Sequence, residues 1–316
     1  MRSSSRRRRG VYIPPMFFVL LVLAGALILC AWFFFHRAPS QPAQPRQNTV
    51  STRQTGRDGI ACVRTELGEE AVYTGDLILV NNWILYHFPE EQPLSCVFDE
   101  KSDSYFVRDK EVFLSPAALE ALNDMMDAFQ AQGGSKTVNV VAGYRTREVQ
   151  QHLFEQSAEI NGQDHARRFV AQPGGSEHHT GLVVDFSLFF EDGSSAEYQG
   201  TGEYAWINQN CQDYGWVVRY DTAKEALTGI GDEPWHFRYV GVPHATVMAE
   251  KNLCLEEYID YLKEFSYNGR RLTVDCAGGT YEIWYCPGTT AYLPESGEYT
   301  VSGNNVDGVI ITCMVE

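Results

Sequence analysis

Two short stretches of the chain bring together the side chains that hydrolytic metal sites use. Residues 176–185 read Ser-Glu-His-His-Thr-Gly-Leu-Val-Val-Asp, and residues 233–236 read Glu-Pro-Trp-His. A catalytic zinc ion takes three protein ligands, keeps an open position for water and has a base beside it. Two imidazoles, a ligand carboxylate and a spare carboxylate supply that set. The two stretches therefore predict a zinc-dependent hydrolytic site.

The residues around these stretches indicate the elements that position them. Asp185 ends the apolar run 182–184, which predicts a buried strand. A carboxylate buried alone is costly, so it needs a partner, and a metal ion is one such partner. Pro234 disfavours helical geometry at Glu233. We therefore expect Glu233 and His236 to lie off a helix, unlike the pair in His-Glu-x-x-His proteases.

The order and spacing of these residues resemble those of a known family. Ser-x-His-x-x-Gly-x-x-x-Asp followed by Glu-Pro-Trp-His is similar to the zinc D-alanyl-D-alanine carboxypeptidases of the VanY type. These belong to a wider group of peptidoglycan metallopeptidases that includes D-Ala-D-Ala dipeptidases. The resemblance covers roughly residues 75–265. It implies that His178, Asp185 and His236 bind Zn²⁺ and that Glu233 is the catalytic base.

A third segment, ahead of the metal motifs, resembles the part of the family that binds substrate. Gly143-Tyr144-Arg145-Thr146, with Gln150 after it, is similar to the family's Tyr-Arg-Ser/Thr segment, whose arginine contacts substrate. Arg145 lies where a predicted strand meets a predicted helix, and a planar guanidinium suits a carboxylate or a polarised carbonyl. We expect Arg145, Gln150 and Ser176 to bind substrate and Arg145 to stabilise the oxyanion together with zinc. Ser176 could instead only fix its turn.

Several neighbouring residues stand outside the ligand pattern or depart from it. His179 adjoins a ligand, and we expect it to lie in or behind the pocket, with ligation as the alternative. Trp235 is expected to pack beside the site. Ile230 occupies a position where many relatives have Tyr, and Val183 one where many have Ala. The histidines that sit in no ligand spacing, and are given no metal role, are His87, His152, His165 and His244.

Charge divides the chain into two parts. Residues 1–57 hold nine Arg, no Lys and no acidic residue, whereas residues 58–316 hold 16 basic and 41 acidic residues, a net charge of −25. A domain this acidic is a poor candidate for binding nucleic acid. Solubility outside a cell is the simpler reason for such a composition.

The N-terminal part carries a membrane signal. Residues 16–35 contain no charge, and twenty residues at about 1.5 Å each span about 30 Å, one hydrocarbon core. That run exceeds the ~7–15 residues of a signal-peptide core. Five Arg precede it and only Arg37 follows closely, which places the N-terminus in the cytoplasm. We expect an uncleaved single-pass helix in the cell membrane, with cleavage as the alternative and the catalytic domain outside the cell.

The last 51 residues change in character. Runs at 272–274, 281–285 and 309–312 predict strands separated by Gly and Asn turns. We expect a small β-rich module that either braces the peptidase domain or binds the wall or a partner. Cys276, Cys286 and Cys313 lie in it, so an oxidising location would favour a disulfide there.

These observations predict an α+β fold, a small, mainly antiparallel sheet flanked by helices with the zinc cleft on the sheet. Residues 1–36 would form the Arg-rich tail and transmembrane anchor, 37–57 a flexible linker, 58–265 the peptidase domain and 266–316 the β module. Apolar runs and capping residues predict strands at 77–80, 138–141 and 216–220, and helices at 116–131, 146–160, 203–213 and 243–265.

The expected activity is removal of the terminal D-Ala from peptidoglycan stem peptides by a membrane-anchored zinc peptidase. Glu233 would take a proton from water and pass it to the leaving amine. Neighbouring activities are a D-Ala-D-Ala dipeptidase and a stem-peptide endopeptidase. A protein of another class, a wall-binding or sensor protein with a structural zinc, is the remaining alternative. The spare carboxylate of Glu233 speaks against it, because a structural zinc needs no base.

Overall fold

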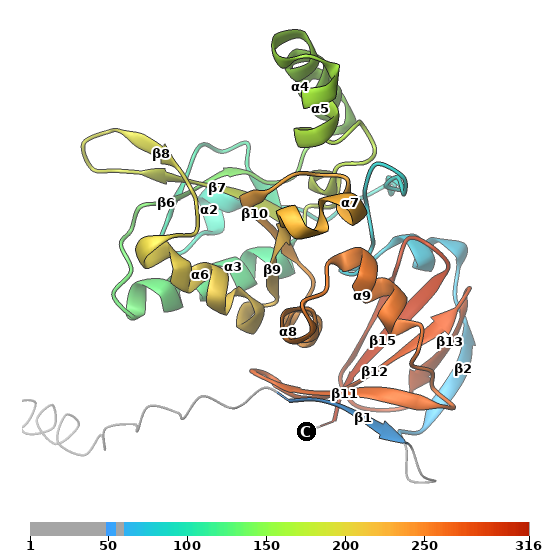
Figure 1. The fold of residues 1–316 in the computed structure, drawn as a ribbon. Coiled ribbons are helices and arrows are strands. Elements are labelled where there is room, and N and C mark those ends of the chain that lie inside the picture. The colour runs from blue at the N-terminus through green and yellow to red at the C-terminus, as the bar shows by residue number, and fades with distance from the viewer. Residues whose placement is uncertain (1–48, 55–59, 316) are drawn as a thin grey trace, which may run out of the picture. The chain divides into compact units, whose positions relative to one another are not determined.

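The computed structural model describes residues 49–54 and 60–315 (Figure 1). The expected tail and anchor, residues 1–36, and most of the expected linker lie outside these ranges. None of the helices within them has the length and apolar character needed to cross a membrane. The described part is an α+β fold with small, mainly antiparallel sheets and flanking helices, so the predicted fold class is confirmed for this part of the chain.

The first sheet carries Asp185, Glu233 and His236 of the two predicted metal motifs. Its strand order is β4-β6-β7-β10-β9, with β8 added beside β7, and β4 with β6 is its parallel pair. The strands are β4 (Phe106–Val107), β6 (Val138–Ala142), β7 (Val183–Phe189), β8 (Ser195–Glu197), β9 (Trp216–Tyr220) and β10 (Glu233–Tyr239). Glu233 and His236 are thus on a strand, as the proline between them predicts. A small two-stranded sheet pairs β3 (Ser95–Cys96) with β5 (Phe113–Leu114).

Helices cover both faces of this sheet (Figure 1). On one side, α3 (Pro116–Ala131) begins where the Ser115 hydroxyl accepts a hydrogen bond from the Ala118 backbone N–H. Its buried residues Leu122, Met126 and Phe129 pack with those of β6 and β7 in one core. On the other side stand α4 (Arg147–Asn161), capped by Thr146, and α5 (Gln163–Phe169). The remaining short helices are α2 (Val97–Glu100), α6 (Ala205–Asn210) and α7 (Glu225–Thr228).

The second sheet has the order β1-β11-β12-β15-β14, and β2 pairs separately with β13. Its members are β1 (Thr49–Gln54), β2 (Cys62–Glu66), β11 (Arg270–Cys276), β12 (Gly279–Pro287), β13 (Thr290–Pro294), β14 (Tyr299–Gly303) and β15 (Gly308–Met314). Strand β1 falls in the range expected to be linker, and β2 in the range expected to be peptidase. The β module is therefore not built from residues 266–316 alone, because strands from the N-terminal side pair with its open edges.

The strand predicted at 77–80 is wrong. The segment is a buried loop whose backbone groups pair mostly with side chains, and the Leu79 N–H donates to the Asn304 carbonyl at 3.2 Å. The Leu77 N–H donates to Ser302 Oγ at 2.8 Å, Asn305 Nδ2 donates to the Leu79 carbonyl at 2.8 Å, and Arg238 Nη2 donates to the Ile78 carbonyl at 3.0 Å. An apolar run needs burial, but it does not need a ladder when side chains satisfy its backbone.

The helix predicted at 243–265 is two helices, α8 (Val242–Lys251) and α9 (Leu255–Leu262). They separate at Asn252, which has a left-handed backbone with φ of 52°. Buried residues of both helices share one core with β11, β12 and β15 of the second sheet. The expected disulfide in the module is wrong: every cysteine in residues 60–315 is a free thiol, Cys276, Cys286 and Cys313 included.

His244 links α8 to the neighbouring elements, and it predicts a pH dependence of stability. Its Nδ1 lies 2.8 Å from Tyr258 Oη and its Nε2 lies 2.9 Å from Thr312 Oγ1. Burial lowers the pKa of His244 from 6.5 to about 3. Below pH 6.5 the unfolded chain binds a proton at this residue that the folded chain excludes, so stability falls with decreasing pH.

We expect this one residue to cost about 2 kcal/mol of unfolding free energy at about pH 5 relative to neutral pH. Denaturant unfolding of the wild type and His244→Gln, each at both pH values, measures it. The wild type should lose more stability on acidification than the variant. Equal losses would show that His244 does not titrate in the unfolding transition.

Candidate active site

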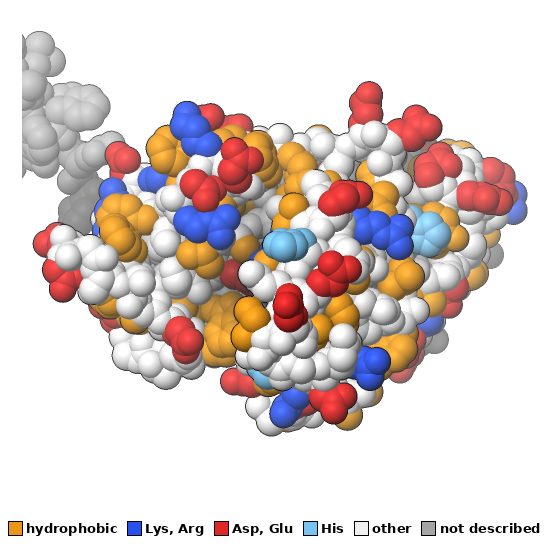
Figure 2. All heavy atoms as spheres, turned by 90° about the horizontal axis from the view of Figure 1, so that it is seen from above, with side chains coloured by type: hydrophobic (Ala, Val, Ile, Leu, Met, Phe, Trp, Pro, Cys, Tyr) orange, Lys and Arg blue, Asp and Glu red, His pale blue; other side chains and the backbone are white. Residues whose placement is uncertain are grey.

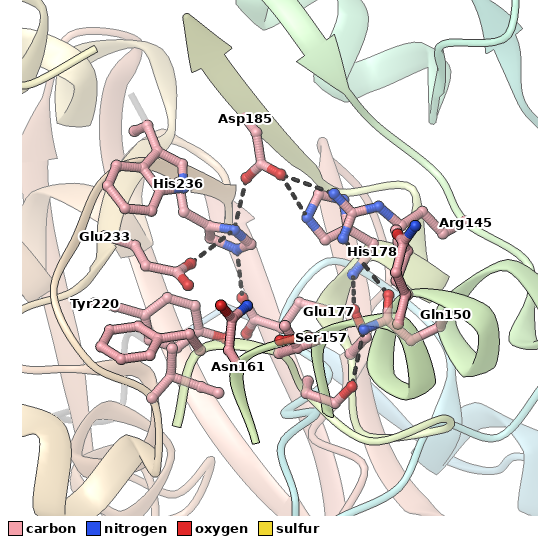
Figure 3. A pocket seen from close by; sticks show the side chains of 18 of the residues that line it. Arg145, Gln150, Ser157, Asn161, Glu177, His178, Asp185, Tyr220, Glu233 and His236 are labelled. Atoms are coloured by element: carbon pink, nitrogen blue, oxygen red, sulfur yellow. Dashed lines mark hydrogen bonds and ion pairs between the residues drawn. The ribbon is translucent and has the colours of Figure 1, made fainter. Parts of the chain in front are cut away.

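The residues of both motifs line one cavity of about 390 Å³ beside the first sheet (Figure 3). Antiparallel pairing of β10 with β7 places His236 opposite Asp185. His178 enters from the 3₁₀ helix η2 (Glu177–Thr180), which ends at Gly181 in a left-handed conformation just before β7. Helices α4 and α5 supply the opposite wall. Residues far apart in the sequence thus meet because adjacent strands hold them in register.

Three side chains have the geometry of a metal site. His178 Nε2 lies 3.1 Å from Asp185 Oδ2, and His236 Nδ1 lies 2.9 Å from Asp185 Oδ1. The candidate ligand atoms of these three residues all lie within 4.8 Å of one another. Two imidazole nitrogens and a carboxylate oxygen are a donor set that suits Zn²⁺. The residues fit the metal that the sequence predicts.

The orientation of His178 is set by the end of β6. Its Nδ1 donates a hydrogen bond to the Gly143 carbonyl at 2.6 Å, which leaves Nε2 with its lone pair toward Asp185. Gly143 is required here, because a Cβ at this position would lie 2.4 Å from the Phe113 carbonyl oxygen. Burial, followed by the nearby Arg145, lowers the pKa of His178 to about 4, so the ring is neutral and can act as a ligand.

Arg145 directly contacts Asp185, one of the three candidate metal ligands. Its Nη2 donates to Asp185 Oδ2 at 2.9 Å and its Nη1 lies 3.5 Å from Gln150 Oε1. Gln150 is buried and donates from Nε2 to the Ala171 carbonyl at 2.8 Å. Burial opposes the charge of Asp185, yet the neighbouring histidines hold the pKa of this carboxyl well below its ordinary value. Asp185 is therefore an anion ready to bind a cation.

Glu233 lies at the start of β10 and lines the same cavity. Its Oε2 is 3.6 Å from His236 Nδ1, so it stands beside the candidate ligands without belonging to the cluster. Burial, and to a smaller extent Asp185, raises the pKa of Glu233 to about 7. A carboxylate with a raised pKa next to a metal site can accept and release a proton near neutral pH.

The structure also shows where three other residues named from the sequence lie: Ser176, His179 and Trp235. Ser176 lines the cavity, and its Oγ accepts a hydrogen bond from the His178 N–H at 3.3 Å, so it fixes the turn; its contact with substrate stays a prediction. The alternative that His179 is a ligand is wrong for this structure. Its Nδ1 donates to the Arg145 carbonyl at 2.8 Å, and its Nε2 accepts from the Gly174 N–H at 3.0 Å. Trp235 lines the cavity and packs on the first core.

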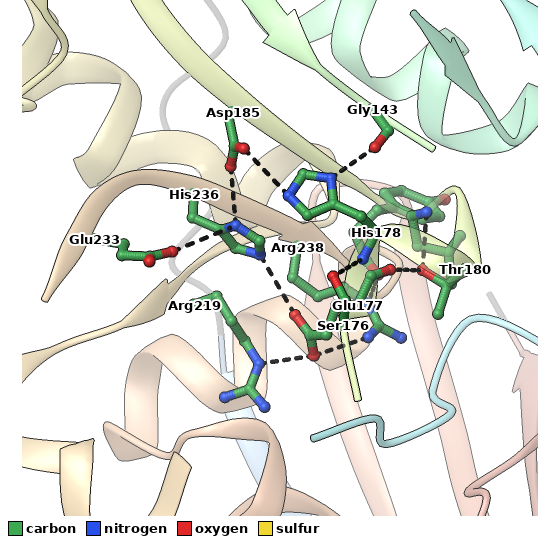
Figure 4. A network of polar contacts seen from close by, with 12 residues as sticks. Gly143, Ser176, Glu177, His178, Thr180, Asp185, Arg219, Glu233, His236 and Arg238 are labelled. Carbon is green, nitrogen blue, oxygen red and sulfur yellow. Dashed lines mark hydrogen bonds and ion pairs between the residues drawn. The ribbon is translucent and has the colours of Figure 1, made fainter. Parts of the chain in front are cut away.

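Sequence reasoning missed a buried group of charges behind the ligands (Figure 4). Glu177 Oε1 accepts hydrogen bonds from Arg219 Nε at 2.8 Å and from Arg238 Nη1 at 3.0 Å. Arg219 also binds Glu256 through both terminal nitrogens. A signal was present, since Arg219 lies within the strand predicted at 216–220 and Arg238 lies among the apolar residues 237–240, and a buried charge requires a partner.

Comparison with known proteins places the chain in a family. Residues 111–242 match the VanY family model, described as D-alanyl-D-alanine carboxypeptidase. A D-alanyl-D-alanine carboxypeptidase of Enterococcus faecium is 33% identical over 88% of this chain and 86% of its own length. The bifunctional D-Ala-D-Ala dipeptidase and carboxypeptidase VanXYC of Enterococcus gallinarum is 36% identical over 49% of this chain and 82% of its own length. The chain belongs to the VanY family of D-alanyl-D-alanine carboxypeptidases, and it is an enzyme of this metallopeptidase family.

A solved structure shares most of the fold. The crystal structure of the D,D-dipeptidase VanXYg in complex with a D-Ala-D-Ala phosphinate analogue is 29% identical, with a TM-score of 0.69. The match covers 84% of this chain and 99% of that one. Such coverage extends well beyond residues 111–242, so the likeness is not limited to the part matched by the family model.

Proposed function

We propose that this protein is a membrane-anchored zinc peptidase that removes the terminal D-Ala from peptidoglycan stem peptides. The observation that carries the proposal is the cavity in which Glu233 stands beside His178, Asp185 and His236. Its relatives named for this activity support the choice of substrate. The alternative of a wall-binding protein with a structural zinc does not account for a buried base with a raised pKa in an accessible cavity.

Zinc held by His178, Asp185 and His236 would supply Lewis-acid activation of water and of the substrate carbonyl. Glu233 accepts the proton of the attacking water on its carboxylate and donates it to the nitrogen of the leaving D-Ala. Burial raises the pKa of this carboxyl to about 7, so it can take up and release a proton near neutral pH. The two transfers return Glu233 to its starting state, as a catalytic cycle requires.

Arg145 stabilises the negative charge that develops on the scissile carbonyl oxygen. Its guanidinium lines the cavity and is held in place by Asp185 and Gln150, so its direction is fixed before substrate binds. Gln150 acts in this scheme through Arg145. Ser176 lies at the cavity wall beside His178 and contributes a polar contact to the bound peptide.

Replacing Arg145 with Lys tests this role. Lysine keeps the charge but loses the planar fork, so kcat/KM should fall by roughly 10²-fold, or about 2.7 kcal/mol. Steady-state kinetics on a pentapeptide measures the fall, and metal analysis should show unchanged zinc content. Arg147→Lys is the matched control, because Arg147 is exposed on α4 next to the site. Wild-type kinetics in Arg145→Lys would remove Arg145 from the catalytic site.

A second cavity next to the first favours a longer peptide over a free dipeptide as the substrate. A cavity of about 610 Å³, lined in part by Tyr144, Thr146 and Phe113, shares Arg145 and Leu153 with the first cavity. The part of a stem peptide on the amino side of the scissile bond can therefore continue past Arg145. Ile230 presents an apolar side chain to the first cavity.

One assay separates the candidate activities. Mass spectrometry follows products when the zinc-loaded protein is incubated with a pentapeptide, a tetrapeptide and free D-Ala-D-Ala. Release of D-Ala from the pentapeptide, with slower cleavage of the dipeptide, is the expected result. Internal cleavage would identify an endopeptidase, and faster hydrolysis of the free dipeptide a dipeptidase. A lack of cleavage in all three would overturn the proposed function.

The location of the protein is proposed from the uncharged run at 16–35 and the excess of Arg before it. The domain would lie outside the cell, tethered to the membrane near its wall substrate. Figure 2 shows a face of the protein on which acidic, basic and hydrophobic side chains are interleaved. Protease added to intact protoplasts should digest the folded domain and spare the N-terminal tail. A soluble, cleaved form as the main product would reject the anchor.

A further inference from the structure

We propose that Glu177 is a positioning residue that holds His236 with its Nδ1 directed to the metal site, an inference that rests on the zinc site proposed above. Glu177 lies between Ser176 and the ligand His178 in the sequence, yet its side chain points to the other ligand histidine (Figure 4). Glu177 is not one of the three residues whose candidate ligand atoms lie within 4.8 Å of one another, which are His178, Asp185 and His236.

The geometry pairs two atoms that have no other hydrogen-bond partner. Glu177 Oε2 and His236 Nε2 are both fully buried, and neither makes a hydrogen bond to another described residue. They face each other at 3.6 Å. On the opposite side of the ring, His236 Nδ1 faces Asp185. The imidazole therefore lies between a carboxylate at the metal site and a carboxylate behind it.

Two arginines fix Glu177 in this position. Arg219 and Arg238 both donate to its Oε1, which leaves Oε2 as the atom turned to His236. Both guanidinium groups are buried with it, so the negative charge of this carboxylate is paired with positive charge at 2.8 and 3.0 Å. Arg238 is held in turn by the carbonyls of Asp76 and Ile78, so the carboxylate has little freedom to turn away.

A metal ligand must present a lone pair, so the proton of a neutral imidazole has to lie on the other nitrogen. A carboxylate facing that N–H favours the correct tautomer and the correct ring orientation, and it makes the ligating nitrogen more basic. With zinc bound, Nδ1 of His236 would be the ligating atom and Nε2 would carry the proton. Glu177 selects this tautomer because its fixed anionic oxygen accepts a hydrogen bond and cannot donate one.

Glu177→Gln tests the proposal, because glutamine keeps the shape of the side chain but replaces one acceptor oxygen with an NH₂ donor. One orientation of the amide turns its NH₂ group to His236 and favours the wrong tautomer. The other turns the NH₂ group to two arginine donors. We expect the full-length variant to bind zinc 10- to 100-fold more weakly than the wild type, measured by competition with a chelator. Glu177→Asp keeps the charge and should retain more zinc affinity than Glu177→Gln.

Two further measurements separate positioning from general destabilisation. Glu282 on β12 is buried and pairs with Arg271 at 2.7 Å, so Glu282→Gln makes the same chemical change away from the site and should bind zinc as the wild type does. Nitrogen-15 NMR of the imidazoles in zinc-loaded protein should show the His236 proton on Nε2 in the wild type and a changed pattern in Glu177→Gln.

The zinc affinities and the His236 spectrum together decide whether Glu177 positions His236. Equal zinc affinity and an unchanged His236 spectrum in Glu177→Gln would overturn the positioning role. An equal loss of affinity in Glu282→Gln would also overturn it, since the loss would then follow stability. Absence of zinc binding by the wild type would instead reject the zinc site and the proposed function with it.

Discussion

Glu233→Gln is expected to keep its zinc and lose its turnover. Glutamine has the size and hydrogen-bonding reach of glutamate, but it cannot accept the proton of the attacking water. Removal of general acid–base catalysis should lower kcat by about 10²–10⁴-fold. In the proposed cycle Glu233 would act in both proton transfers, so a fall beyond this range also fits the proposal. Zinc content should stay near that of the wild type, since Glu233 is not in the cluster formed by His178, Asp185 and His236.

Zinc analysis, thermal melting and single-turnover kinetics on the same preparations measure this separation. Asp232→Asn is the matched control, because Asp232 is the neighbouring carboxylate but is exposed. It should keep both zinc and turnover. Full activity in Glu233→Gln would show that the base is elsewhere. Loss of zinc in Glu233→Gln, with retention in His236→Ala, would overturn the ligand assignment.

The second large effect distinguishes two adjacent histidines. His178→Ala should lose zinc and activity together, because three protein ligands become two. His179→Ala should retain zinc, since both ring nitrogens of His179 are already used in bonds to backbone groups. It should lose some stability, because the Arg145 carbonyl and the Gly174 N–H would then lack a partner.

Metal analysis after equilibration with one equivalent of zinc, followed by peptide hydrolysis, provides the comparison. The two variants remove the same side chain from neighbouring positions of η2, so a general effect of losing a histidine should appear in both. Zinc loss in His179→Ala with retention in His178→Ala would reverse the assignment. Loss in both would point to collapse of η2 instead of removal of a ligand.

Local sequence was sufficient for the parts of the site that depend on a few neighbouring residues. Pro234 kept Glu233 and His236 off a helix, and the apolar run before Asp185 placed it on a strand. The caps of α3 and α4 were readable because Ser115 and Thr146 act on N–H groups three residues away. The same local patterns failed at 77–80, where the run is buried but its backbone groups bond to Ser302, Asn305 and Arg238.

The sequence by itself determined the inventory of the candidate site: two ligand-type histidines, an aspartate at the end of an apolar run, a spare carboxylate and an arginine in a family-like order. Only the tertiary structure decided which atoms face one another. The Gly143 carbonyl binds His178 Nδ1 and leaves Nε2 facing Asp185, and Glu177 meets Arg219 and Arg238 from strands 42 and 61 residues away. The physical reason is that propensity and periodicity act over a few residues. The partner of a buried charge is instead chosen by strand register and packing between distant segments.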